Sequence, residues 1–220
     1  MKHIKFGLSA TLVALASQAV AGSFDGPYVQ VAIGGVSTQT ESNYNAIGFG
    51  NRNSNEGAFL GQVLAGYSQS IDRVNLAANV FYNIGDQKSG NNSGTDNAYG
   101  YTGALSQKFK LKNSWGVSLE PGAYITEKTL GYLKLSYYNS QLNYDVNAAL
   151  SGPDINYNSG FNSSKSMNGI GYGLGVKQMF TDNVYGLVEY QHVQYDTWND
   201  GAVSYKPNQN YGWIGVGYKF

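Results

Sequence analysis

Apolar residues along this chain recur at every second position. Val29, Val31 and Ile33 alternate with smaller or polar residues, and the same spacing returns in Ile214, Val216, Tyr218 and Phe220. A period of two is typical of β-strands whose two faces meet different surroundings. The pattern predicts eight strands, over residues 27–39, 57–70, 74–85, 112–125, 129–142, 167–180, 184–196 and 211–220. Residues 99–111 alternate in part, and we interpret them as an extension of the fourth strand.

The predicted connections alternate between short and long. Three are short and polar, as tight hairpins require, at residues 70–73, 126–129 and 181–184. Four are long and rich in Asn, Gly and Ser, at residues 40–56, 86–111, 143–166 and 197–210. Short turns at one end and long loops at the other are typical of a barrel in an outer membrane, with the long loops outside the cell.

A closed barrel satisfies the constraint that a bilayer sets. Lipid offers the backbone no hydrogen-bond partner, so strands that span it must pair with one another and leave no edge. No apolar run beyond the N-terminal segment is long enough for a membrane helix. The predicted fold class is therefore all-β, a closed antiparallel eight-stranded transmembrane β-barrel. Eight strands leave an interior that side chains can fill, and inward positions carry the large residues Trp213, Tyr124 and Leu187.

The face opposite the apolar residues carries charges. Glu120 and Lys134 flank one predicted tight turn at comparable distances, and Lys177 and Glu189 flank another. Antiparallel pairing would set each Glu and Lys roughly level, so we predict an interior ion-pair network of Glu120, Lys134, Lys177 and Glu189. The alternative places these side chains in water near the rim, without fixed partners.

The N-terminus has the features of a cleaved signal peptide. Lys2 and Lys5 precede an apolar run over residues 6–16, and small residues follow at Ala19 and Ala21. This predicts a signal peptide over 1–21 and a barrel domain over 22–220. The segment holds two of the 14 lysines and arginines and none of the 14 acidic residues, which leaves the mature chain at net charge −2. That charge does not favour nucleic acid as a partner.

Several segments resemble the small eight-stranded outer-membrane barrels, namely the opacity-type porin-like proteins and the OmpA-type membrane domain. They are GPYVQVAIGG at 26–35, SLEPGAYIT at 118–126, LGYLKLSY at 130–137 and YGWIGVGYKF at 211–220. The last resembles a barrel-assembly signal, in which Tyr218 and Phe220 would be read by the assembly machinery. The resemblance implies the outer membrane of a Gram-negative bacterium as location, with lipid and lipopolysaccharide as partners.

Two local features carry their own predictions. Aromatic girdles are expected at the membrane interfaces, with Tyr218 and Phe220 at the periplasmic end and Tyr28, Tyr137, Tyr138 and Tyr195 at the other. Pro121 lies inside the fourth strand although proline cannot donate to a ladder, so we expect a β-bulge over 120–122.

The sequence favours a structural or surface-interaction role, like that of an adhesin or antigen, over catalysis. The chain has no cysteine, and beyond the predicted signal peptide it has a single histidine, His192, so no catalytic residue, metal ligand or cofactor is assigned. Aromatic residues in or beside the long connections could contact a host or phage ligand: Tyr44, Phe49, Tyr157, Phe161, Tyr195 and Trp198. The alternatives are a porin-like channel for small solutes and, less favoured, a lipid-modifying enzyme.

Overall fold

The computed structural model describes residues 22–43, 51–98, 101–200 and 203–220. The predicted signal peptide over 1–21 lies outside them. The strands are β1 (Gly26–Asn43), β2 (Asn51–Ile71), β3 (Val74–Ile84), β4 (Gln87–Ala98), β5 (Tyr101–Thr126), β6 (Thr129–Ser151), β7 (Asn156–Met179), β8 (Val184–Tyr195), β9 (Trp198–Asp200) and β10 (Val203–Lys219). No helix in the described part of the chain is long and apolar enough to cross a membrane.

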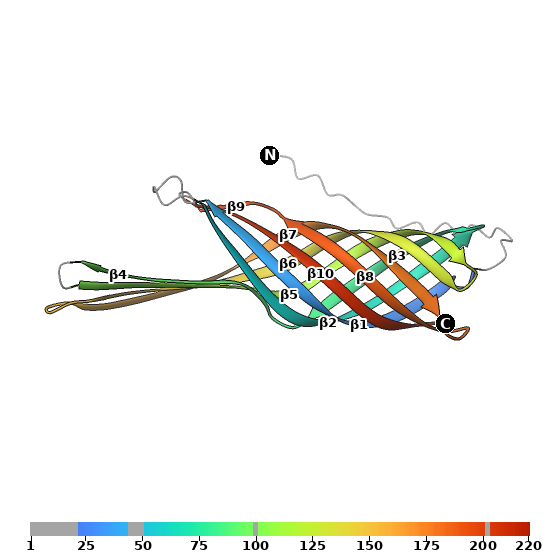
Figure 1. The fold of residues 1–220 in the computed structure, drawn as a ribbon, viewed down its shortest axis with the longest axis horizontal. Coiled ribbons are helices and arrows are strands. Elements are labelled where there is room, and N and C mark those ends of the chain that lie inside the picture. Colours follow the sequence, from blue (N-terminus) through green and yellow to red (C-terminus); the bar gives the residue numbers. More distant parts are fainter. Residues whose placement is uncertain (1–21, 44–50, 99–100, 201–202) are drawn as a thin grey trace, which may run out of the picture.

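Eight of these strands form a closed ring in the order β1-β2-β3-β5-β6-β7-β8-β10 (Figure 1). Every ladder is antiparallel, and β1 closes the ring by pairing with β10 from Tyr28–Lys219 to Asn43–Ser204. The predicted fold class is confirmed. The three tight turns lie between β2 and β3, β5 and β6, and β7 and β8, where the sequence placed them.

The long connections are mostly strand, which corrects the prediction of long loops. β5 is continuous from Tyr101, so residues 101–111 do extend the predicted fourth strand. β6 and β7 pair without a register shift from Thr129–Gln178 to Ser151–Asn156. The pattern is weakest in β7, where only Tyr157, Phe161 and Met167 are large and apolar over 156–167, whereas in β6 apolar residues still alternate with polar ones up to Leu150. Strand pairing still provides hydrogen bonds for the backbone amides and carbonyls of these segments. Outside the membrane, a strand needs no apolar face in addition.

The extensions of β5, β6 and β7 form, with β4, a sheet that projects beyond the barrel (Figure 1). We call the region of residues 87–98, 101–112, 141–151 and 156–167 the extracellular sheet, after the side predicted for the barrel end opposite the tight turns. Its order is β4-β5-β6-β7. β8 pairs with β7 only from Gly169 onward. Among the described residues, β7 therefore has an open edge over 156–167, with β6 as its only neighbour there.

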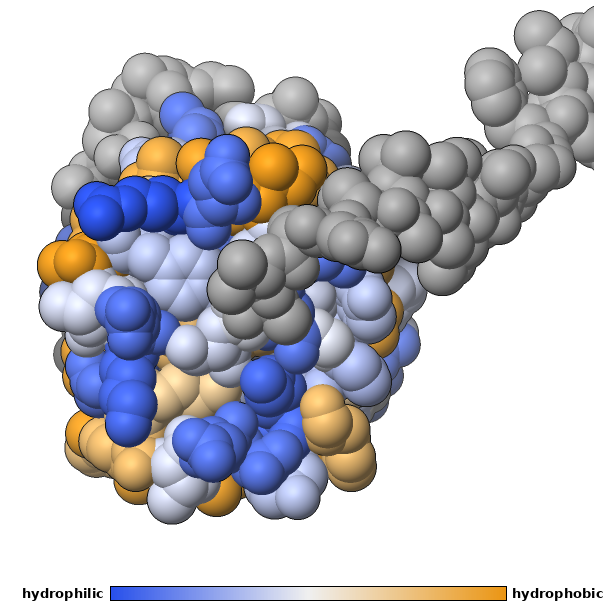
Figure 2. All heavy atoms as spheres, turned by 90° about the vertical axis from the view of Figure 1, so that its right-hand side faces the viewer, coloured by the Kyte–Doolittle hydropathy of each residue, from blue (hydrophilic) through white to orange (hydrophobic). Residues whose placement is uncertain are grey.

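The outer wall of the barrel is apolar where lipid would cover it. Outward side chains such as Ile33, Leu135, Leu174 and Val188 are exposed, while their neighbours along each strand are buried inside. Viewed from the end that carries the tight turns, hydrophilic residues surround the barrel mouth and hydrophobic residues lie on its outer rim (Figure 2). This is the inside-out polarity of a membrane barrel.

The bulge expected at Pro121 is wrong. β5 pairs with β6 in one register from Leu119–Leu135 to Gly122–Tyr132, and with β3 through Pro121–Leu76. Proline removes one donor, and the ladder tolerates that loss without an inserted residue. The register shifts of β5 instead fall between Lys112 and Trp115 and between Tyr124 and Thr126.

The girdle prediction is wrong for three residues. Tyr28, Tyr138 and Tyr195 point into the barrel and are buried, and Tyr28 lies at the periplasmic end, paired with Lys219. Tyr137, Tyr218 and Phe220 do face outward. The three inward tyrosines occupy positions of inward register, and each hydroxyl finds a polar partner inside.

An arginine on the lipid face should destabilise the barrel in proportion to its depth. Val80 is outward-facing and central in β3, so we expect Val80→Arg to lower the free energy of unfolding by about 2–4 kcal/mol. Urea titration in lipid vesicles measures this. Asn158→Arg, on the exposed part of β7 outside the barrel, is the control and should change stability by less than about 0.5 kcal/mol. Equal effects of the two substitutions would contradict the assigned membrane face.

Candidate functional site: the filled interior and the extracellular sheet

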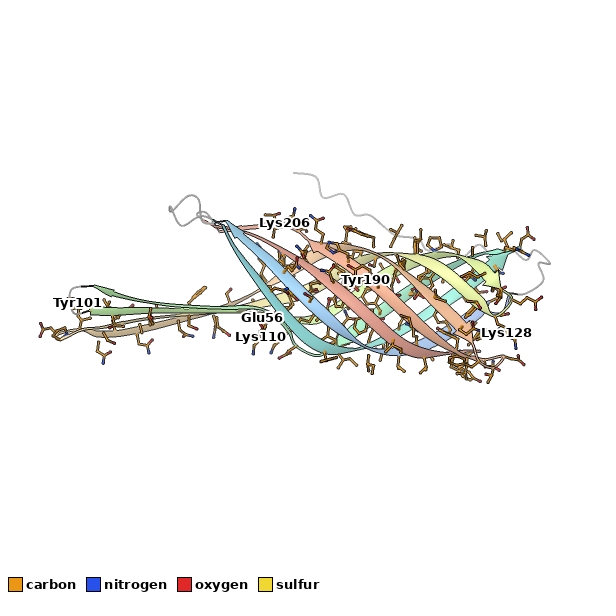
Figure 3. The ribbon with its side chains drawn as sticks, viewed as in Figure 1. Glu56, Tyr101, Lys110, Lys128, Tyr190 and Lys206 are labelled. Atoms are coloured by element: carbon orange, nitrogen blue, oxygen red, sulfur yellow. The ribbon has the colours of Figure 1, made fainter. Side chains whose placement is uncertain are left out.

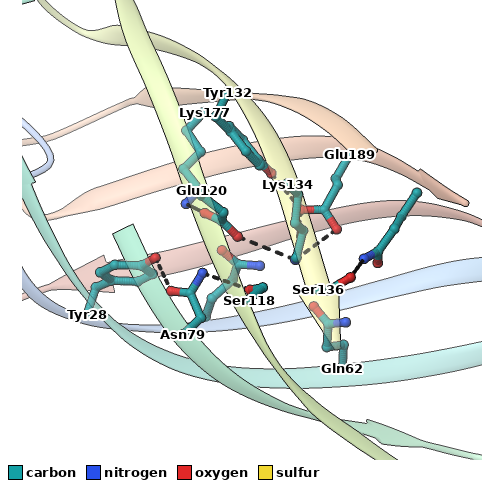
Figure 4. A network of polar contacts seen from close by, with 12 residues as sticks. Tyr28, Gln62, Asn79, Ser118, Glu120, Tyr132, Lys134, Ser136, Lys177 and Glu189 are labelled. Carbon is teal, nitrogen blue, oxygen red and sulfur yellow. Dashed lines mark hydrogen bonds and ion pairs between the residues drawn. The ribbon is translucent and has the colours of Figure 1, made fainter. Parts of the chain in front are cut away.

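Four charged side chains from four successive strands meet inside the barrel (Figure 4). Lys134 Nζ lies 3.0 Å from both carboxylate oxygens of Glu189 and 3.4 Å from Glu120 Oε1. Lys177 Nζ donates to Glu120 Oε2 at 2.6 Å. All four side chains are buried. The structure therefore brings together the four predicted residues as two cations and two anions in one chain of contacts.

The pairing within this network differs from the expected one in one respect. Glu120 and Lys134 are level, as the register between β5 and β6 requires. Lys177 lies opposite Leu187, however, and Glu189 opposite Gly175, so the turn between β7 and β8 sets that pair two residues out of step. Lys177 reaches instead to Glu120 on β5.

Glycine at position 175 makes room for a further member of the network. A Cβ there would come within 2.5 Å of the Tyr132 ring, which crosses this position. The Tyr132 hydroxyl donates to Glu189 Oε2 at 2.8 Å. Sequence reasoning missed Tyr132, although its inward register on β6 places it two residues from Lys134.

Aromatic rings line the cations on their remaining sides. Lys177 Nζ lies 4.7 Å from the ring centroid of Tyr132 and 5.0 Å from that of Tyr28, and Lys134 Nζ lies 5.6 Å from that of Phe81. The electron-rich ring faces attract a cation that has lost its water. Ion pairs and ring faces together offset the cost of burying the two ammonium groups.

The extracellular half of the interior is neutral and filled by tyrosines and glutamines. Tyr211 donates to Gln209 Oε1 at 2.6 Å, Tyr195 donates to the same oxygen at 2.9 Å, and Gln209 Nε2 donates to Gln87 Oε1 at 2.6 Å. Tyr211 stacks on Trp213, with ring centroids 5.5 Å apart. The alternation pattern predicts no role for these glutamines, because Gln87 and Gln209 fall in the predicted long connections 86–111 and 197–210.

Bulky groups fill the lumen along its length. Trp213 and Leu187 are buried inside, as the filled-interior prediction requires. At the periplasmic mouth, Phe24 packs against Tyr124 and Tyr185. The cavity beside Phe24 and Tyr28 has a volume of about 10 Å³, which holds at most one water.

The predicted surface contacts divide into three groups. Tyr157 and Phe161 lie on β7 in the extracellular sheet, 61% and 60% exposed. Tyr195 is not a surface residue, because its side chain lies in the interior cluster. Trp198 lies in β9, where it pairs with Tyr205; Tyr44 and Phe49 fall outside the described residues.

The face of β7 that points into the barrel becomes exposed in the extracellular sheet. Tyr157 and Phe161 share the register that points inward lower on β7, and Leu150 lies opposite Tyr157 on β6. In the barrel this face carries apolar and polar side chains in similar numbers, whereas here Tyr157 and Phe161 expose their rings among serines and Lys165. The reverse face of β7 carries Asn158, Asn162 and Ser164, all exposed. We call this side of the sheet, with the exposed side chains of Tyr157, Phe161 and Leu150, the apolar face.

His192 lies on the outer wall of the barrel. Its Nδ1 is 2.8 Å from Asn210 Oδ1, and its ring lies 5.2 Å from that of Tyr172. The described residues hold no group of three or more His, Cys, Asp or Glu arranged to bind a metal.

A closed antiparallel ring with an apolar outer wall and a polar interior defines a membrane β-barrel. The chain belongs to the outer membrane protein beta-barrel domain family, which it matches over residues 6–220. It is therefore a protein of the outer membrane. A search of curated proteins gives no match.

Solved structures resemble the chain at low sequence identity. The attachment invasion locus protein Ail of Yersinia pestis is 14% identical, covering 89% of this chain and 99% of its own, with a TM-score of 0.40. Neisserial surface protein A is 16% identical, with coverages of 91% and 99% and a TM-score of 0.36. The outer membrane protease OmpT from Escherichia coli is 10% identical, with coverages of 92% and 99% and a TM-score of 0.48.

Removing one cation from the interior network should destabilise the barrel strongly. Lys134→Met leaves Glu189 buried without its cation, so we expect a loss of about 3–5 kcal/mol in the free energy of unfolding, measured by urea titration in lipid vesicles. Lys112 pairs with Asp86 at 3.7 Å on the surface, and Lys112→Met should cost at most about 1 kcal/mol.

The double variant Lys134→Met/Glu189→Gln tests the coupling between the two groups. It should recover part of the loss, because the unpaired charge is gone. Strictly additive losses would show that Lys134 and Glu189 act independently.

Proposed function

We propose that this outer-membrane barrel is a surface-interaction protein, which binds an external partner through its extracellular sheet. The observation that carries the proposal is the open edge of β7 over residues 156–167, bordered by the exposed apolar side chains of Tyr157 and Phe161. The barrel holds this sheet outside the membrane, as the placement of the tight turns at the opposite end implies (Figure 1).

An open edge offers unpaired backbone donors and acceptors to an incoming strand. Proteins usually shorten, charge or cover such edges, because they template pairing with other chains. Residues 156–167 include Lys165 as the one charged residue and no proline. An extended segment of a partner can add to this edge and gain main-chain hydrogen bonds, while side-chain pockets beside the edge provide specificity.

The apolar face adds a second element of recognition. A partner strand added next to β7 would place alternate side chains beside Tyr157 and Phe161, on the face that also carries Leu150. Burying such side chains contributes affinity in proportion to the area removed from water. The partner class that fits is a protein of a host cell or phage surface with an exposed, partly apolar strand.

The filled interior favours this role over that of a channel. Stacked rings and a paired charge network occupy the space that a solute would need. A lipid-modifying enzyme or a protease would need a nucleophile next to a base. The described site residues provide no such pair, and we do not propose catalysis.

Substitutions on the apolar face should reduce adhesion while the polar face tolerates change. We expect Tyr157→Ser/Phe161→Ser to lower adhesion of bacteria producing the protein to epithelial monolayers several-fold. The matched control, Asn158→Ser/Asn162→Ser, changes the reverse face of the same strand and should leave adhesion unchanged. Surface display of each variant is checked with an antibody to an inserted epitope. Equal adhesion of all variants at equal display would remove the sheet from the proposal.

The purified protein should not conduct ions. In planar bilayers we expect no stable conductance step, because side chains that hold one another by hydrogen bonds and ion pairs fill the lumen. Insertion is verified by the heat-modifiable gel shift of the folded barrel, and a known porin is the positive control. Reproducible steps of a single size would favour the channel.

A further inference from the structure

The outer wall has a groove where two glycines face each other. Gly35 on β1 pairs with Gly212 on β10, and a Cβ at either position would meet open space. In the same row, Phe59 on β2 pairs with Gly35, and Tyr190 on β8 pairs with Gly212. In this row, the backbones of β1 and β10 therefore carry no side chain and lie between the outward rings of Phe59 and Tyr190. The groove has a volume of about 640 Å³, and Ile33, Ile214, Val188, Leu174 and Val176 complete its walls.

The groove lies at the extracellular limit of the apolar wall. One step toward the periplasm along each strand, the outward residues are Ile33, Ile214 and Val188. One step toward the outside they are Ser37, Asn210 and His192. The change from apolar to polar marks the boundary between hydrocarbon and the interfacial region. The groove therefore opens to the outer leaflet.

A small polar cluster borders the groove on its extracellular side. Asn210 Oδ1 accepts from the Tyr190 hydroxyl at 2.8 Å and lies 2.8 Å from His192 Nδ1. Tyr190, labelled in Figure 3, projects from the barrel wall. Both contacts use the same oxygen of Asn210, and no described residue accepts a hydrogen bond from its Nδ2. The cluster thus has a donor left to offer beside the apolar groove.

We propose that this groove is a binding site for one acyl chain of lipopolysaccharide, whose polar linkage bonds to Asn210 and His192. An acyl chain in the groove contacts the glycine backbone beneath it and Phe59 and Tyr190 on either side, which gives more contact than an even wall provides. The acyl chains of lipopolysaccharide carry amide or ester links and hydroxyl groups next to the headgroup, which match the donors and acceptors of the cluster.

The residues that line the groove also indicate which part of the lipid it holds. No Lys or Arg is among them, and phosphate recognition relies on such residues. The site therefore recognises the acyl linkage and not the phosphates. Ordinary phospholipid chains have no hydroxyl group along the chain and should bind more weakly. This inference is independent of binding at the extracellular sheet.

Native mass spectrometry of the folded, delipidated protein tests the site. The probes are rough-type lipopolysaccharide and, separately, a saturated phosphatidylethanolamine. We expect the unaltered protein to retain one lipopolysaccharide molecule. Gly35→Leu/Gly212→Leu fills the groove without a backbone clash, since both positions face open space, and should weaken retention about tenfold or more.

Two further variants separate the groove from general effects on the wall. Ala65→Leu/Ala78→Leu places two leucines at outward positions of β2 and β3, away from the groove, and should retain lipopolysaccharide like the unaltered protein. Asn210→Leu removes the polar end and should reduce the preference for lipopolysaccharide over phosphatidylethanolamine. The heat-modifiable gel shift confirms that each variant is folded.

Three outcomes would overturn the proposal. In the first, the groove-filled variant retains lipopolysaccharide as well as the Ala65→Leu/Ala78→Leu variant. In the second, phosphatidylethanolamine is retained as tightly as lipopolysaccharide, which would show that the site does not recognise the acyl linkage of lipopolysaccharide. In the third, lipid-free dimers disappear when the groove is filled, which would make this face a contact between copies of the chain.

Discussion

The requirement that every backbone amide and carbonyl in the bilayer finds a partner within the protein governs this structure. Lipid supplies no hydrogen bonds, so a sheet that crosses it cannot have an edge. The β1–β10 ladder closes the ring and removes the two edges that an open eight-stranded sheet would have. Closure then dictates the side chains: those facing out meet lipid and are apolar, and those facing in are separated from lipid and can be polar.

The interior shows how charges are accommodated once lipid is excluded. Two lysines and two glutamates form a neutral group, and tyrosine and phenylalanine rings cover the sides of the cations that the carboxylates do not reach. Buried ion pairs of this kind contribute less to net stability than to the choice of one arrangement, because desolvation offsets much of the attraction. The network joins β5, β6, β7 and β8, and therefore holds neighbouring strands in one register.

The same strands behave differently where they leave the membrane. Above the barrel, β5, β6 and β7 continue with β4 as an open sheet, and the face that points into the barrel lower down becomes exposed there. Water satisfies the unpaired edge there, so closure is no longer required. The barrel is thus the anchor, and its strands also build the surface that is exposed to other molecules. The outer wall, by contrast, is apolar and faces lipid, and the groove on it lies where two glycines pair.

The sequence by itself determined the features that depend on local pattern. A period of two in residues such as Val29, Val31 and Ile33 predicts membrane-spanning strands, and short polar turns fix the order of the ring. Level placement across a turn predicted the proximity of Glu120 and Lys134. Only the tertiary structure decided the features that depend on curvature and exact register. Lys177 reaches past β6 to pair with Glu120 on β5. Tyr28, Tyr138 and Tyr195 turn inward. Segments with few apolar residues pair into an extracellular sheet. The physical reason is that a strand's own sequence records which face is apolar, whereas contacts across a closed barrel depend on how eight strands are staggered around it.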